Sequence, residues 1–138
     1  MASIHREVLI DNAPENVWAA VRDFGEVHKR VAPGYVTDTR VEDDIRIVTF
    51  ANGAVVRELI VDIDDEARRI AYAVLGGSLE PEHHHASMQV FGDAENRSRF
   101  VWIIDVTPGS LREPITEMVD QGIRVIKRTL DREAVPPR

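Results

Sequence analysis

The chain has no cysteine among its 138 residues. This absence excludes disulfides, thiol catalysis and cysteine-based zinc sites. It is typical of proteins that reside in the cytoplasm, which is the location that we expect. Long apolar runs are also missing. No stretch approaches the ~18 residues of a membrane-spanning helix, and the first residues lack the apolar core of a secretory signal. We therefore expect no membrane insertion.

Basic residues are outnumbered: 17 Lys and Arg stand against 24 Asp and Glu, for a formal net charge of −7. A nucleic-acid surface needs clustered basic side chains that replace counterions. The densest basic stretch, residues 28–30, is short, so we expect no nucleic-acid partner. The length suits one domain with one core. We expect residues 1–138 to form a single domain whose last residues, 133–138, are a tail.

The most informative local signal is Asn52-Gly53 between two apolar-rich runs. This dipeptide favours a two-residue β-hairpin turn, because both of its residues tolerate a positive φ. A two-residue turn places Arg46 and Arg57 on one sheet face, together with Val48, Phe50, Val55, Leu59, Val61 and Ile63. That face is the more apolar one after the turn, so we expect it to face inward. A charged group there needs a partner or a ligand.

Alternating and helical patterns predict the remaining elements. Strands are expected over residues 3–11, 35–42, 45–51, 54–64, 69–75, 83–91 and 98–107. Short helices are expected over 13–24, capped by Asn12, and over 26–31; a long amphipathic helix follows from Ser110, in a capping box with Glu113, to about residue 132. The order predicts an α+β fold in which a curved, seven-stranded antiparallel sheet wraps around the C-terminal helix. Such an arrangement tends to leave a hollow.

Several motifs carry a resemblance to a known superfamily: Ala13–Trp18, Val21–Phe24, Asp44–Arg46, Arg57-Glu58, Asp64–Glu66, Tyr72, Gly76-Gly77 and Trp102. With these motifs in this order along the sequence, the chain resembles members of the START-like (SRPBCC) superfamily. That group includes the polyketide cyclase/dehydrase and lipid-transport proteins and, more distantly, birch-pollen allergens and abscisic acid receptors. The resemblance implies a helix-grip fold with a ligand cavity. The Leu-Pro gate and His-Arg latch of the receptors are absent here, so we expect any gating to come from residues 76–82 or the C-terminal helix.

Polar residues in phase with apolar ones are the candidate ligand contacts. Arg46 and Arg57 suit an anionic or carbonyl oxygen, although an interior acid or the sheet rim would satisfy them equally. Tyr72 and His84 are candidate hydrogen-bonding groups in the pocket. Phe100, Trp102 and Met118 are candidate wall residues. Gly122, on the apolar stripe of the long helix, indicates either a close packing contact or space for the ligand.

Three successive histidines, His83-His84-His85, raise the question of a metal site. Only His83 and His85 share a strand face, and a zinc site needs at least a third ligand. We therefore expect no metal ion and no cofactor.

The patterns and the resemblance together predict that the protein binds a small hydrophobic or aromatic molecule, such as a lipid or polyketide. Two alternatives stay open. One is a cyclase or dehydratase, in which His84, Tyr72 or an arginine polarises a ketone. The other is a co-activator that binds a partner, or a homodimer, through an outer apolar patch of Ile45, Ile47, Val56 and Ile60.

Overall fold

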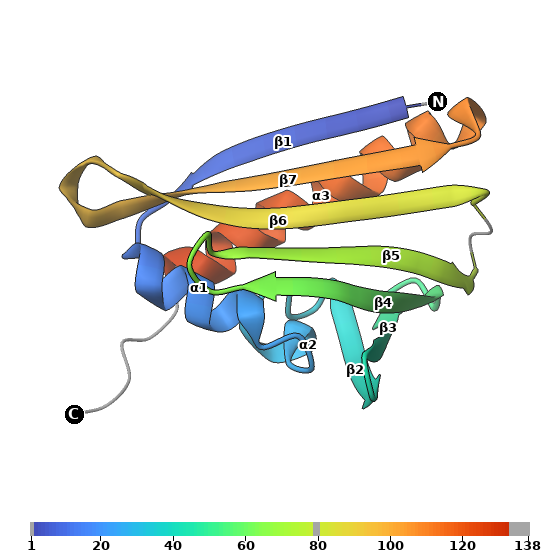
Figure 1. Cartoon of the computed structure of the whole chain (residues 1–138), viewed down its shortest axis with the longest axis horizontal. Helices are drawn as coiled ribbons and strands as arrows, with labels where there is room; N and C mark the ends of the chain where they lie inside the picture. The colour runs from blue at the N-terminus through green and yellow to red at the C-terminus, as the bar shows by residue number, and fades with distance from the viewer. Residues whose placement is uncertain (1, 79–80, 133–138) are drawn as a thin grey trace.

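The computed structural model describes residues 2–78 and 81–132 and orders them as a sheet with three helices (Figure 1). The strands are β1 (Ala2–Ile10), β2 (Val36–Glu42), β3 (Ile45–Phe50), β4 (Val55–Asp64), β5 (Arg69–Gly77), β6 (His83–Asp93) and β7 (Arg97–Thr107). The helices are α1 (Pro14–Arg22), α2 (Val27–Arg30) and α3 (Arg112–Asp131). The expected tail, residues 133–138, lies outside the described residues.

All seven strands belong to one antiparallel sheet with the order β1-β7-β6-β5-β4-β3-β2. Helix α3 runs along one face of this sheet, and α1 and α2 lie below it near the β4 side (Figure 1). The buried stripe of α3 consists of Ile115, Val119, Gly122, Ile126 and Leu130. This α+β, helix-grip architecture confirms the predicted fold class.

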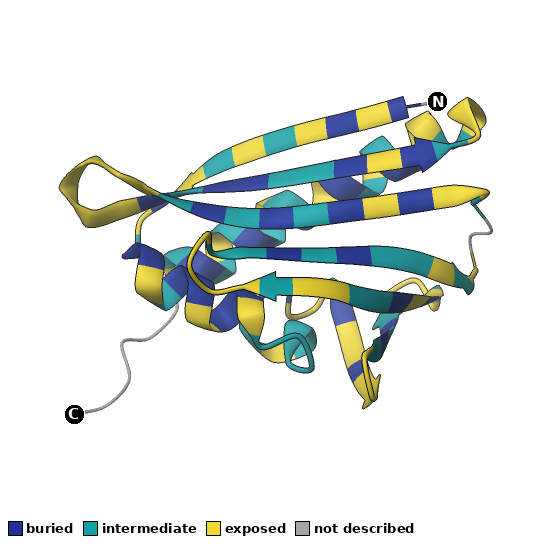
Figure 2. Cartoon of the chain, viewed as in Figure 1, coloured by how far each residue is buried: buried dark blue, intermediate teal, exposed yellow. Residues whose placement is uncertain are grey.

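Buried and exposed positions alternate along the strands, as a sheet with one covered face requires (Figure 2). The core on the covered face divides into two clusters. The larger one joins α1, α2 and the C-terminal half of α3 to the sheet, and the smaller one joins Ile115 and Val119 of α3 to Ile4, Tyr72 and Ile104.

The helix starts differ from the predicted ones. The residue before α1 is Ala13, and Asn12 instead accepts hydrogen bonds from the Ala13 N–H (2.9 Å) and from the Asn16 side chain (3.0 Å). The capping box at Ser110 and Glu113 is wrong, because a single 3-10 turn occupies Gly109–Leu111 and no side chain caps α3.

The β3–β4 hairpin has a three-residue loop rather than a two-residue one. The Phe50 N–H donates to the Ala54 carbonyl (2.8 Å), the Gly53 N–H donates to the Phe50 carbonyl (2.9 Å), and Gly53 has φ +89°. A glycine with positive φ at the third position is typical of such loops. Asn52 accepts a hydrogen bond from the Ala54 N–H (2.9 Å), which closes the turn locally.

One extra loop residue reverses the face of the β4 side chains from Val55 to Val61. Arg46 pairs with Glu58 instead of Leu59, and Val48 pairs with Val56 instead of Arg57. The inward placement of Arg57, Val55, Leu59 and Val61 is therefore wrong. Arg57 is exposed, while Val56 and Glu58 are buried. A register shift between Ile60 and Asp62 restores the phase, so that Ile63 packs against the core as predicted.

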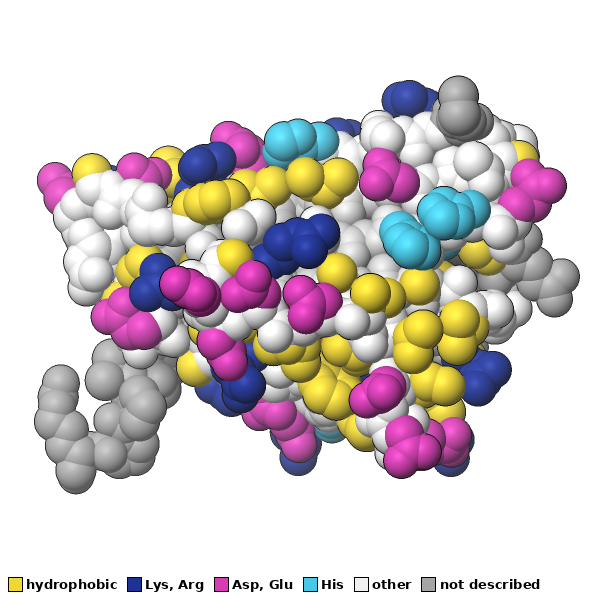
Figure 3. All heavy atoms as spheres, viewed as in Figure 1, with side chains coloured by type: hydrophobic (Ala, Val, Ile, Leu, Met, Phe, Trp, Pro, Cys, Tyr) yellow, Lys and Arg dark blue, Asp and Glu magenta, His cyan; other side chains and the backbone are white. Residues whose placement is uncertain are grey.

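The same reversal changes the outer face of the sheet, which Figure 3 shows with hydrophobic side chains gathered over β3, β4 and β5. The predicted patch of Ile45, Ile47, Val56 and Ile60 does not form, because Val56 is buried and Ile60 packs against the core. The large exposed apolar side chains are instead Leu9, Val41, Val55, Val61 and Leu75.

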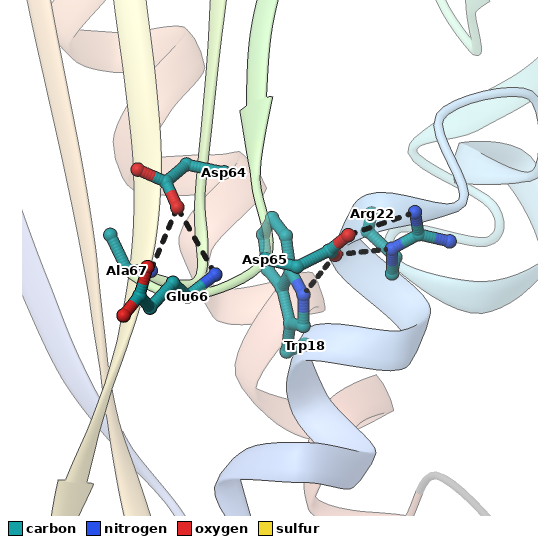
Figure 4. Close-up of polar contacts among 6 residues, drawn as sticks. All are labelled: Trp18, Arg22, Asp64, Asp65, Glu66 and Ala67. Carbon is teal, nitrogen blue, oxygen red and sulfur yellow. Dashed lines mark hydrogen bonds and ion pairs between the residues drawn. The ribbon is translucent and has the colours of Figure 1, made fainter.

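The β4–β5 turn is fastened to α1 (Figure 4). Asp65 accepts a hydrogen bond from Trp18 Nε1 (2.9 Å) and forms an ion pair with Arg22 Nε (2.7 Å). The neighbouring Asp64 accepts from the N–H groups of Glu66 and Ala67, which shapes the turn itself. The acidic cluster at this turn is thus a structural connection between α1 and the sheet. Among the described residues, no helix is long and apolar enough to cross a membrane.

Candidate functional site

A cavity of about 70 Å³ lies between the covered face of the sheet, α2 and α3. Its walls are mostly aliphatic and aromatic, and they include four polar side chains on neighbouring strands: Arg46 (β3), Glu58 (β4), Tyr72 (β5) and His84 (β6). The apolar wall includes Val48, Val56, Val74, Met88, Trp102, Ile104, Ile115, Met118, Val119 and Ile126. A predominantly apolar pocket with a few convergent polar groups is typical of small-molecule sites.

Arg46 and Glu58 form a buried ion pair. Arg46 Nε lies 2.6 Å from Glu58 Oε1, and the two side chains are only 5% and 10% exposed. The Arg46 guanidinium also lies over the Tyr72 ring, 4.9 Å from the ring centre, in a cation–π contact. The alternative in which Arg46 pairs with an interior acid is therefore the one observed. Each charge in this wall is neutralised by the other.

Tyr72 presents a protonated hydroxyl to the site. Trp102 Nε1 donates to Tyr72 Oη (3.1 Å), so the hydroxyl accepts this bond and keeps its own proton for another partner. Burial raises the pKa of Tyr72 above its ordinary range, and the neighbouring Glu58 charge raises it further. The phenol is therefore neutral at physiological pH.

His84 is the second neutral group. It is buried, and neither ring nitrogen hydrogen bonds to another described residue; Nδ1 is also fully enclosed. Burial, with a smaller contribution from the neighbouring His85 and His83, lowers the pKa of His84 to about 4. A neutral imidazole has one donor and one acceptor nitrogen, so His84 offers both functions near the cavity.

A second hollow of about 150 Å³ lies beside the first, at the surface next to Ala51, Asn52 and Gln121. Tyr35, Phe50, Val56 and Met118 line both hollows. The rings of Tyr35 and Phe50 meet edge to face (5.4 Å), and Tyr35 donates a hydrogen bond to the Met118 carbonyl (2.8 Å). These three residues therefore form a closed partition between the inner cavity and the surface hollow.

Five of the predicted site residues line the cavity: Arg46, Tyr72, His84, Trp102 and Met118. The other three do not. Arg57 lies on the outer face. Phe100 is fully buried in the core, paired with Val90 and Val8. A Cβ at Gly122 would lie 3.2 Å from Tyr35 Cε2 and 3.3 Å from Trp102 Cζ3. Because glycine has no Cβ, the rings of Tyr35 and Trp102 can pack closely against α3 at this position.

The sequence analysis missed Glu58 and Tyr35. The predicted two-residue loop shifted the β3–β4 register by one residue and so placed Glu58 on the outer face. An inward arginine needs an acidic partner, and this requirement could have indicated Glu58. Tyr35 was expected as the first residue of a strand over residues 35–42, whereas in the structure it stands just before β2. No pattern in the sequence places such a loop residue against α3.

His83 and His85 stack on the outer face, with ring centres 4.4 Å apart. The residues that the structure describes contain no group of three potential metal ligands. The three histidines therefore differ in orientation: His84 faces the cavity, and its neighbours face outward.

The comparisons with known proteins concern the family and the fold. Residues 1–133 match the family model of polyketide cyclase / dehydrase and lipid transport proteins. No curated protein sequence matches the chain. The structure is similar to XoxI from Bacillus cereus, at 17% identity and a TM-score of 0.84, over 94% of this chain and 96% of that one.

Two further solved structures share the fold. A protein from Thermobifida fusca is 23% identical with a TM-score of 0.78, over 95% of this chain and 91% of that one. A START superfamily protein from Mycobacterium smegmatis is 12% identical with a TM-score of 0.69, over 94% of each chain. The helix-grip fold, the enclosed cavity and the match over nearly the whole chain lead to one conclusion: the protein belongs to the START-like polyketide cyclase/dehydrase and lipid transport family.

Proposed function

We propose that the protein binds a small hydrophobic or aromatic molecule in the cavity between the sheet and α3. The observation that carries this proposal is an apolar cavity with polar side chains that the core does not fully use. Among the described residues, none accepts the Tyr72 hydroxyl proton and none hydrogen bonds to a ring nitrogen of His84. Unused hydrogen-bonding capacity in a buried site costs free energy unless a ligand or water supplies the partner.

The cavity must enlarge for this role. Its volume of about 70 Å³ is below the ~150 Å³ at which an apolar cavity in another protein accepts benzene, and far below the ~300 Å³ of ordinary ligand sites. The partition of Tyr35, Phe50 and Met118 is the place where enlargement joins the cavity to the surface hollow. Met118 is well suited to move, because an unbranched thioether side chain repacks easily.

This route is a refinement of the predicted gating. Met118 belongs to the C-terminal helix and Ser78 to the 76–82 segment, and both line the surface hollow. Leu79 and Glu80 of that segment lie outside the described residues. Tyr35 and Phe50 were not expected to take part. The short hairpin loop positions Phe50 at the partition, so the β3–β4 corner contributes a wall to the proposed entrance.

Native mass spectrometry of the purified protein, mixed with a panel of fatty acids, flavonoids and polyketides, tests the proposal. We expect a one-to-one adduct with at least one aromatic or lipid compound. Val74→Phe fills the cavity wall and should abolish the adduct. Val61→Phe is the matched control, because Val61 is exposed on the outer face, and it should leave the adduct intact.

Circular dichroism must first show that both phenylalanine variants fold, since added volume in a core costs about 1–3 kcal/mol. Absence of an adduct with every compound in the panel would refute the proposal. An adduct that survives Val74→Phe and is lost with Val61→Phe would place binding on the outer face instead.

A second candidate function is acid–base catalysis on a bound ketone. Tyr72 can donate its proton to a carbonyl oxygen, and the neutral His84 can accept a proton from the adjacent carbon. The pKa of about 4 makes His84 a weak base at neutral pH, which favours binding over turnover. Conversion of a β-hydroxyketone that is lost in both His84→Ala and Tyr72→Phe, with binding retained, would favour the enzyme.

A further inference from the structure

The charge balance of the cavity restricts what it can hold. Arg46 and Glu58 are the only charged side chains among the described residues that line it, and they are bonded to each other at 2.6 Å. Within the described part of the chain, the guanidinium otherwise makes one long contact of 3.5 Å with the Phe24 carbonyl and lies against the Tyr72 ring. The described lining of the cavity therefore has no net charge, because its one cation, Arg46, is paired with its one anion, Glu58.

Resting on the proposed function, we infer that the cavity selects uncharged molecules that end in a hydroxyl group, such as phenols, over the matching carboxylates. Two unpaired inward arginines would have favoured an anionic oxygen, but Arg46 is already paired with Glu58 and Arg57 lies on the outer face.

A carboxylate meets two costs in this cavity. It loses its hydration on entry, and burial of an unpaired ion is among the least favourable steps in protein chemistry. It also cannot use Arg46 without approaching Glu58, which would place two negative charges beside one positive charge in a low-dielectric site. Displacing Glu58 from Arg46 would in turn leave Glu58 buried without a partner.

A hydroxyl group meets neither cost, because it both donates and accepts. The Tyr72 hydroxyl can donate to it, and an unprotonated nitrogen of His84 can accept from it. Tyr72 pairs with Ala86 across β5 and β6, and His84 lies two residues along β6 on the same face. Diagonal neighbours of this kind have Cα atoms about 7–8 Å apart, and both side chains line the cavity, so their polar groups face the same part of it.

Titration calorimetry with three probes tests the inference at pH 7.5: naphthalene, 2-naphthol and 2-naphthoate. The probes share one ring system, so the cost of opening the partition cancels in their affinity ratios. A phenol stays protonated and a carboxylic acid ionises at this pH. We expect 2-naphthol to bind at least about 100-fold more tightly than 2-naphthoate, and about tenfold more tightly than naphthalene.

Variants separate charge from hydrogen bonding. Glu58→Gln removes the compensating anion, so the affinity for 2-naphthoate should rise at least tenfold. Asp62→Asn is the matched control: it makes the same change in net charge at an exposed position of β4 and should leave the ratio unchanged. Tyr72→Phe should lower the affinity for 2-naphthol about tenfold without affecting naphthalene.

Glu58→Gln leaves Arg46 unpaired and can destabilise the fold, so a second variant is needed. In Arg46→Met/Glu58→Met both charges are absent and the cavity is again neutral, so the preference for 2-naphthol should persist. Equal or tighter binding of 2-naphthoate to the unaltered protein would overturn the inference and leave the proposed function standing. Failure of all three probes to bind would refute the inference, whereas the proposed function would be refuted only if the mass-spectrometric panel also gave no adduct.

Discussion

The buried pair of Arg46 and Glu58 makes the sharpest prediction about stability. Replacing Glu58 with Met leaves the guanidinium buried among apolar side chains with no counter-ion. Loss of one partner of a buried pair costs about 3–5 kcal/mol, whereas replacement of both partners by apolar side chains is often neutral or stabilising. The two groups qualify as buried, since they are 5% and 10% exposed and lie 2.6 Å apart.

The expected free energies of unfolding follow from this asymmetry. Glu58→Met and Arg46→Met should each lose about 3–5 kcal/mol, and the double variant should lose less than either one. At roughly 3 °C per kcal/mol for a chain of this size, each single variant should melt about 10–15 °C lower than the unaltered protein.

Urea titrations followed by circular dichroism measure all four forms. Glu42→Gln is the control, because its ion pair with Arg40 is long (3.7 Å) and both side chains are more than half exposed. It should change stability by less than about 0.5 kcal/mol. Additive losses in the double variant, or single variants no worse than Glu42→Gln, would refute the argument that the pair is buried and mutually dependent.

Three other predictions concern pH and backbone. The pKa of His84 is lowered from 6.5 to about 4, so between these values the unfolded chain binds a proton that the folded chain does not. The free energy of unfolding should therefore fall by up to about 3 kcal/mol as the pH drops through this window, and His84→Phe should remove that part of the decline in urea titrations. The bonds from Arg22 and Trp18 lower the pKa of Asp65 below 3.8, so its stabilisation is present above that pH and is lost as the pH falls further. Asp65→Asn should lower the melting temperature at neutral pH, and the difference from the unaltered protein should shrink as the pH falls below 3.8; a constant difference would contradict the assignment. A Cβ at Gly77, where φ is +127°, would collide with the Val55 carbonyl, whereas one at Gly53 meets nothing. Gly77→Ala should therefore cost more than about 2 kcal/mol and Gly53→Ala about 1 kcal/mol in the same titrations, and equal losses would refute the clash.

The fold was predictable because its signals are local and repeated. Alternation along Phe100, Trp102, Ile104 and Val106 fixes a half-buried strand, and the stripe from Ile115 to Leu130 requires a helix with one covered face. The long helix is expected over about 20 residues and α3 has 20. The ends of the helices were less predictable, because the 3-10 turn at Gly109–Leu111 competes with the Ser110 cap.

The site was predictable only where a single strand determined it. Tyr72 and His84 are in phase with their own apolar neighbours, and both line the cavity. Arg57 failed because its orientation depends on the length of a loop, and Asn-Gly occurs in loops of two and of three residues. Tyr35 and the partition that it forms depend on how α3 packs across the sheet. That contact joins residues 83 positions apart, and no local pattern encodes it.

The three-residue hairpin loop has a consequence for how this region can change. Removing or inserting one residue between Phe50 and Ala54 would turn Glu58 outward and bring Arg57 toward Arg46, exchanging a neutral cavity wall for one with two positive charges. A change of two residues would preserve the orientation of the strand. In natural or engineered variants that keep the same ligand class, the length of this loop should therefore differ by an even number of residues. A difference of an odd number of residues should mark a protein that recognises a different class of molecule.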